Sequence, residues 1–129
     1  MSATVLPNES DGTLNLDKVE LAIRNHHDIH QPKTELLCLE NTQNRCGGVV
    51  LPLSYIQEAK QRMAPRGIKI HMDGARILNA SVASGISVAK IVENVDSVSM
   101  CFSKVAFELG GYRIQSCSQI HSISTLNYL

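Results

Sequence analysis

The chain has 129 residues, 43% of them hydrophobic, which is enough for one domain with its own core. Its 12 basic and 12 acidic residues cancel, and no basic stripe is present, which argues against a nucleic-acid partner. No apolar run indicates a signal peptide or a membrane span. The four scattered cysteines, Cys38, Cys46, Cys101 and Cys117, are expected to be free thiols, so the sequence predicts a cytoplasmic protein with no membrane partner.

The first predicted element is a helix over residues 16–25. Its apolar positions Leu16, Val19 and Ile23 are spaced i, i+3 and i+7, and Asn15 is a suitable N-cap. The polar segment that follows contains three histidines, His26, His27 and His30. No cysteine or carboxylate stands near them at zinc-finger spacing, so we expect a solvated loop and no metal site.

A short apolar run over 35–39 predicts a strand buried on both faces. It ends in the polar residues 40–44, which are expected to form the rim of a crevice. Residues 45–48 then form a flexible turn containing two glycines. From the residues alone, an ordinary surface loop at 40–44 is favoured over a binding rim.

The next predicted helix begins at Pro52 or Ser54 and ends near residue 63. Ser54 and Gln57 fit a capping box, and Glu58 and Arg62 are spaced to pair at i, i+4. This helix lies between two predicted strands. A strand–helix–strand unit crosses over with a right hand, so the two strands should be parallel.

The central stretch, residues 68–104, carries the candidate site. Alternating apolar residues predict strands over 68–72 and 97–102, and Gly74 separates the first strand from a helix over 75–83. Asp73 and Arg76 follow the first strand, and Lys104 follows the second. Ligands of parallel α/β sheets usually bind at the carboxyl ends of the strands, so these three side chains are expected in one crevice.

Three separated motifs carry a resemblance to a known family: CLENTQNRCGGVVLPL at 38–53, HMDGARILNA at 71–80 and DSVSMCFSK at 96–104. In this order they resemble the threonine aldolases, pyridoxal-phosphate enzymes of the aspartate-aminotransferase-like fold (fold type I). The resemblance implies a three-layer α/β fold with a mostly parallel sheet, in which residues 1–104 form part of the cofactor-binding large domain. Residues 105–129 depart from the family pattern and are expected to be a poorly ordered tail.

The resemblance also implies roles for the candidate residues. Asp73 would stand beside the pyridine nitrogen and keep it protonated, while Lys104 would condense with the cofactor aldehyde. Arg76 would pair with a substrate carboxylate or with the polar edge of the cofactor. Without the resemblance, Asp73 is equally explained as a helix N-cap, Arg76 as a surface arginine and Lys104 as a solvated lysine.

Many family members carry histidine where this chain has Gln43. Glutamine can hydrogen-bond but cannot transfer a proton near neutral pH, so an acid–base role is not expected at this position.

The implied reaction is cleavage of threonine or allo-threonine to glycine and acetaldehyde by a homo-oligomer. In the family, the phosphate-binding turn and the histidine that stacks on the cofactor ring precede the segment matching Pro7. We therefore expect this chain to be a truncated form that lacks turnover and is poorly soluble. Two alternatives stay open: a non-catalytic fragment that associates with full-length subunits, and a binding remnant without chemistry.

Overall fold

Three parallel strands form the centre of the fold: β1 (Leu36–Glu40), β2 (Lys69–Gly74) and β3 (Ser97–Met100). Their spatial order is β1-β2-β3, and both neighbouring pairs are parallel. The computed structural model describes residues 3–24, 30 and 32–101. Within this part of the chain, the predicted parallel α/β arrangement is confirmed, with each strand within about two residues of its expected bounds.

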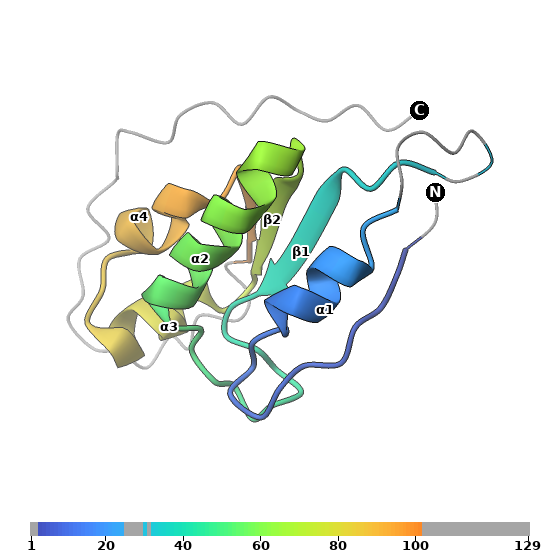
Figure 1. The fold of residues 1–129 in the computed structure, drawn as a ribbon. Helices are drawn as coiled ribbons and strands as arrows, with labels where there is room; N and C mark the ends of the chain where they lie inside the picture. The colour runs from blue at the N-terminus through green and yellow to red at the C-terminus, as the bar shows by residue number, and fades with distance from the viewer. Residues whose placement is uncertain (1–2, 25–29, 31, 102–129) are drawn as a thin grey trace.

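One helix precedes the first strand, and the other helices fill the connections between the strands. They are α1 (Leu16–Leu21), α2 (Leu53–Met63), the 3₁₀ turn η1 (Ala64–Arg66), α3 (Ile77–Ser84), α4 (Val88–Ile91) and the 3₁₀ turn η2 (Val92–Asn94). Figure 1 shows α1, α2 and α4 in front of the sheet, with α3 near the end at which the strands finish. The helix that joins β1 to β2 is α2, so this unit has the predicted strand–helix–strand order.

The helix starts differ in how well the sequence predicts them. Asn15 caps α1 as expected, because its Oδ1 accepts hydrogen bonds from Asp17 N and Lys18 N, both at 3.1 Å. The capping box predicted for α2 is wrong. Pro52 is the N-cap, with φ −59° and ψ 137°, and no side chain caps the helix. Ser54 already lies inside the first turn, because the proline starts the helix earlier than the box would.

Burial alternates along β1 and β2, so the prediction that β1 is buried on both faces is wrong. Leu37 and Leu39 are buried, whereas Leu36 is 47% exposed and Cys38 is also exposed. In the described part of the chain the apolar core lies on the helix side of the sheet, so only every second residue of β1 enters it. The largest fully buried side chains of that core are Ile56, Met63, Ile68, Ile70, Met72 and Ile77.

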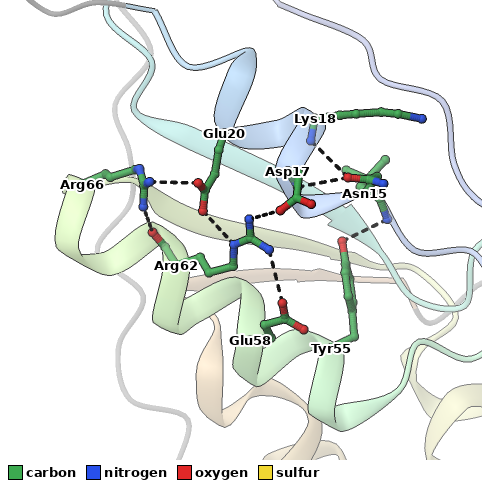
Figure 2. A network of polar contacts seen from close by, with 9 residues as sticks. Asn15, Asp17, Lys18, Glu20, Tyr55, Glu58, Arg62 and Arg66 are labelled. Carbon is green, nitrogen blue, oxygen red and sulfur yellow. Dashed lines mark hydrogen bonds and ion pairs between the residues drawn. The ribbon is translucent and has the colours of Figure 1, made fainter.

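An ion-pair cluster fastens α1 to α2 (Figure 2). Arg62 Nε donates to Glu20 Oε1 at 2.7 Å, and its guanidinium also binds Asp17. The predicted i, i+4 pair is confirmed, with Arg62 Nη1 3.3 Å from Glu58 Oε1. Arg66 donates to the second oxygen of Glu20 at 3.0 Å. The hydrogen bond between Glu20 and Arg62 raises the pKa of the guanidinium and lowers that of the carboxyl.

A second polar junction joins α2, β2 and the start of β3 through Asp96. Its Oδ2 accepts hydrogen bonds from Lys60 Nζ and from Ile70 N, both at 2.8 Å, and its Oδ1 lies 3.4 Å from Lys69 Nζ. Burial alone would raise the pKa of Asp96, but the hydrogen bonds from Lys60 and Ile70 outweigh it and lower the pKa.

The substitution Asp96→Asn tests this junction. A lowered pKa in the folded state means that the carboxylate stabilises the fold above the unfolded-state pKa of about 3.9. That contribution is lost as the pH falls through the folded-state pKa. At pH 7 we expect a loss of about 1–2 kcal/mol in the free energy of unfolding. The difference between the two proteins should shrink below about pH 4.

Urea unfolding at pH 7 and at pH 3.5 measures both effects. The matched control is Glu93→Gln, which removes the exposed 2.6 Å ion pair with Lys90. It should change stability by less than about 0.5 kcal/mol. An equal loss for Asp96→Asn at both pH values would contradict the assignment.

Candidate functional site

The parallel register places three polar side chains in one row at the carboxyl end of the sheet. Glu40 of β1 is the partner of Asp73 of β2, and Asp73 is the partner of Ser99 of β3. Register partners in a parallel sheet point to the same face, so these side chains are neighbours. A further backbone hydrogen bond, Asn41 N to Asp73 O at 2.9 Å, continues the pairing past the last residue of β1.

Asp73 is exposed at the end of β2, and its Oδ1 accepts a hydrogen bond from Ala75 N at 3.0 Å. Ser99 Oγ reaches the same oxygen at 3.5 Å. The residue at the N-cap of α3 is Arg76, so Asp73 is not the helix cap that it resembles in the sequence. The exposed carboxylate is therefore held at the mouth of the β2–α3 turn through its Oδ1.

Gly74 allows β3 to approach this turn closely. A Cβ atom at this position would lie 2.8 Å from Ser99 O and 2.9 Å from Val98 Cγ2, both closer than real contacts allow. The absence of a side chain at residue 74 is therefore what brings the end of β3 up to the Asp73 carboxylate.

Arg76 lies between the end of β2 and α3, with 28% of its side chain exposed. Its Nη1 is 3.8 Å from Oε1 of Glu40, whose side chain is 32% exposed. Asp73 and Arg76 thus reach the same end of the sheet, as their spacing predicts. Lys104 lies outside the described residues. The sequence placed Glu40 only in a polar rim and did not identify it as the partner of Arg76.

Gln43 is a buried brace in the loop after β1, with only 5% of the residue exposed. Its Nε2 donates to Asn8 Oδ1 at 3.2 Å, and its Oε1 accepts from Cys46 N at 2.9 Å. Gly12 packs directly on this side chain. Both ends of the amide are therefore used to hold the N-terminal segment against the loop. No sequence signal points to Asn8, which is 35 residues away.

A cleft of about 640 Å³ lies between the N-terminal segment and the loop after β1. Its lining residues are Val5, Leu6, Pro7, Asn8, Glu40, Gln43, Arg45 and Cys46. Figure 1 shows these two segments meeting at the end of the sheet where β1 finishes. Glu40 therefore belongs both to this cleft and to the ion pair with Arg76.

Asn41 adds a polar donor next to this row. The residue is 1% exposed, and its Oδ1 accepts a hydrogen bond from Leu51 N at 3.2 Å. Its Nδ2 has no hydrogen-bond partner within the described residues. A buried donor without an acceptor costs about 1–3 kcal/mol, so this position is suited to a bound water or ligand.

The residues at the strand ends fit a polar aromatic cofactor such as pyridoxal phosphate. The second oxygen of the exposed Asp73 carboxylate can accept a hydrogen bond from a protonated ring nitrogen, and Arg76 can bind an anionic group. By contrast, the described part of the chain contains no group of three or more His, Cys, Asp or Glu residues that could hold a metal ion. His26 and His27 lie outside it.

Within the same described ranges, no helix is long and apolar enough to cross a membrane. Cys38 and Cys46 form no disulfide bond, as expected, and Cys117 is not among the described residues.

A sequence model of the beta-eliminating lyase family matches residues 1–112. The chain belongs to this family. It is 51% identical over 98 residues to an Arabidopsis thaliana protein named probable low-specificity L-threonine aldolase 2, which covers 75% of this chain and 28% of the relative. It is 47% identical over 95 residues to the low-specificity L-threonine aldolase of Escherichia coli K12. That match covers 74% of this chain and 27% of the relative. The chain thus spans about a quarter of the length of these relatives.

The fold is shared with the solved structure of a protein assigned as an L-allo-threonine aldolase from Listeria monocytogenes. The TM-score is 0.58 at 21% identity, over 75% of this chain and 24% of the other. This likeness confirms the predicted α/β fold class. The family match extends to residue 112, past the boundary that the sequence predicts at Lys104. That boundary stays a prediction.

The brace formed by Gln43 can be tested by substitution. Gln43→Ala removes two hydrogen bonds and leaves the partner groups in Asn8 and Cys46 unpaired. We expect the free energy of unfolding to fall by about 2–3 kcal/mol. Gln61→Ala on the exposed side of α2 is the matched control and should change it by less than about 0.5 kcal/mol. Urea titrations compare them, and equal stabilities for the two variants would show that the brace is not formed.

Proposed function

We propose that this chain is the central part of the cofactor-binding domain of a pyridoxal-phosphate-dependent lyase of the threonine-aldolase type. The observation that carries the proposal is the exposed Asp73 carboxylate, held at the end of β2 beside Arg76 and Glu40. The similarity to threonine aldolases from a plant and a bacterium supports the same conclusion. The substrate would be threonine or allo-threonine, and the products glycine and acetaldehyde.

When bound, pyridoxal phosphate supplies an electron sink that weakens bonds to the α-carbon of an amino acid. The role of Asp73 is to keep a proton on the ring nitrogen, because a carboxylate beside that nitrogen favours its charged form. The hydrogen bonds from Ala75 N and Ser99 Oγ fix one oxygen of Asp73, so the other is presented in a set direction.

The remaining roles follow from the chemistry of the side chains. Arg76 would bind the carboxylate of the amino acid, to which a guanidinium can donate two parallel hydrogen bonds. Lys104 would hold the cofactor covalently, because a lysine amine can react with an aldehyde group. Gln43 cannot gain or lose a proton near neutral pH, so the proton of the substrate hydroxyl would have to pass to another group.

The assembly and location of the protein are also proposals. A cytoplasmic homo-oligomer follows from the family resemblance. A second reading, a non-catalytic chain that associates with full-length subunits, is favoured by the sheet face away from the core. That face exposes the apolar side chain of Leu36 at 47%. Co-purification with an intact aldolase subunit would favour this second reading.

Binding of the cofactor tests the first reading without requiring turnover. We expect pyridoxal phosphate to change its absorbance on addition to the chain, and borohydride reduction to leave a pyridoxyl group on Lys104. Peptide mass spectrometry locates that group. Lys104→Ala should abolish the modification, whereas Lys90→Ala, which removes an exposed lysine of α4, should leave it unchanged. Modification spread evenly over all lysines would refute the proposal.

A variant of Asp73 tests the same site through affinity. Asp73→Asn keeps the size of the side chain but removes its charge. A lost charge-assisted hydrogen bond should weaken cofactor binding by about tenfold or more. The titration is followed by the same absorbance change, and an unaltered affinity would exclude Asp73 from the ring-nitrogen role.

For the chain alone, we expect release of glycine and acetaldehyde from threonine to remain at background. Productive sites tolerate only about 0.5 Å of slack in the position of reacting groups. Asp73 and Arg76 are the two cofactor or substrate anchors that we assign among the described residues. Turnover that disappears in Lys104→Ala would prove this expectation wrong.

A further inference from the structure

We propose that Glu40 is a resident counter-ion of Arg76, a placeholder that the carboxylate of a small ligand such as an amino acid displaces. The inference rests on the proposed function only in taking Arg76 as a carboxylate-binding residue. It involves no bound cofactor, so it can succeed or fail separately.

The backbone holds the two partners at fixed positions. Glu40 is the last residue of β1 and the register partner of Asp73, and the hydrogen bond from Asn41 N to Asp73 O secures that strand end. Arg76 stands at the N-cap of α3. The pair therefore joins two segments far apart in the sequence, and only the ends of the two side chains are free to rearrange.

The contact between the two side chains is loose. The 3.8 Å between Arg76 Nη1 and Glu40 Oε1 is an ion-pair distance, but it exceeds the 2.7–3.2 Å of an N–H···O hydrogen bond. About a third of each side chain is exposed, so the attraction is weakened by solvent. A ligand carboxylate that accepts two short hydrogen bonds from the same guanidinium would be the better partner.

Arg62 is a structural arginine of the same chain, and its contacts can be compared with those of Arg76. It binds Glu20 at 2.7 Å and also contacts Asp17 and Glu58, so its donors are taken by three carboxylates. Arg76 has Glu40 as its ion-pair partner among the described residues. Most of its five N–H donors therefore stay available to a ligand.

The surroundings allow Glu40 to leave. The other acid in the row, Asp73, is held by Ala75 N, so it is not the group that exchanges. Glu40 lines the cleft of about 640 Å³ beside the N-terminal segment. Its side chain can swing into this space when a ligand takes its place on Arg76.

The test measures access to Arg76 with phenylglyoxal, which reacts with free guanidino groups. The full chain is modified, and peptide mass spectrometry reads the rates at Arg76 and Arg62 in the same sample. Glu40→Gln should speed the reaction at Arg76 by roughly two- to fivefold, the range of a weak ion pair. The acetate concentration that half-protects Arg76 should fall by a similar factor. Arg62 should react at an unchanged rate, and Glu93→Gln should alter neither value.

Two results would overturn the proposal. An unchanged rate at Arg76 with unchanged protection by acetate would show that Glu40 does not occupy it. Slower reaction or weaker protection would show that Glu40 orients Arg76 for its ligand and does not compete with that ligand.

If Arg62 also reacts faster, the Glu40→Gln variant has lost its fold. The variant Glu40→Asp is then used in its place. The shorter side chain keeps the charge but lengthens the contact with Arg76. A smaller acceleration at Arg76, with an unchanged rate at Arg62, supports the placeholder role. No acceleration at Arg76 contradicts that role. Failure of cofactor binding together with success here would reject the proposed function and keep this inference.

Discussion

The parallel pairing of β2 with both of its neighbours is the constraint on which the candidate site depends. Because register partners share a face, the pairing of β2 with β1 and with β3 places Glu40, Asp73 and Ser99 side by side. Gly74 makes that pairing possible at the strand end, where any side chain would collide with Ser99 O. A slip of one residue would turn Asp73 to the helix side of the sheet and bury a charge in the core.

Charged residues in the described part of this chain have two different roles: some hold the fold together, and others can bind a ligand. Arg62 and Asp96 each bind several partners at hydrogen-bond distance and connect separate elements of the fold. At the strand ends, Asp73 is exposed and Arg76 is half-buried, and both have fewer or longer contacts. Side chains that hold the fold are saturated, whereas those that can bind a ligand keep unused donors and acceptors.

The features predicted correctly from the sequence are those set by local pattern. Period-2 alternation gave the strands, the helical segment between them gave parallel pairing, and both together placed Asp73 near Arg76. One-sided burial of β1 was missed, because a run such as Leu36–Leu39 is apolar whether or not a second layer covers it. The contacts of Glu40 with Arg76 and of Asn8 with Gln43 were also missed, since they join distant segments that no local pattern connects.

Gln43 shows how a side chain that does not titrate can hold two segments together at the edge of the cleft. Its amide donates one hydrogen bond to Asn8 and accepts one from Cys46 N. A neutral histidine also has one ring N–H donor and one ring acceptor, so either residue type offers the donor and acceptor that this brace needs. Only histidine can gain or lose a proton near neutral pH. Glutamine here therefore holds the junction between the N-terminal segment and the loop without placing a titrating group at the edge of the cleft.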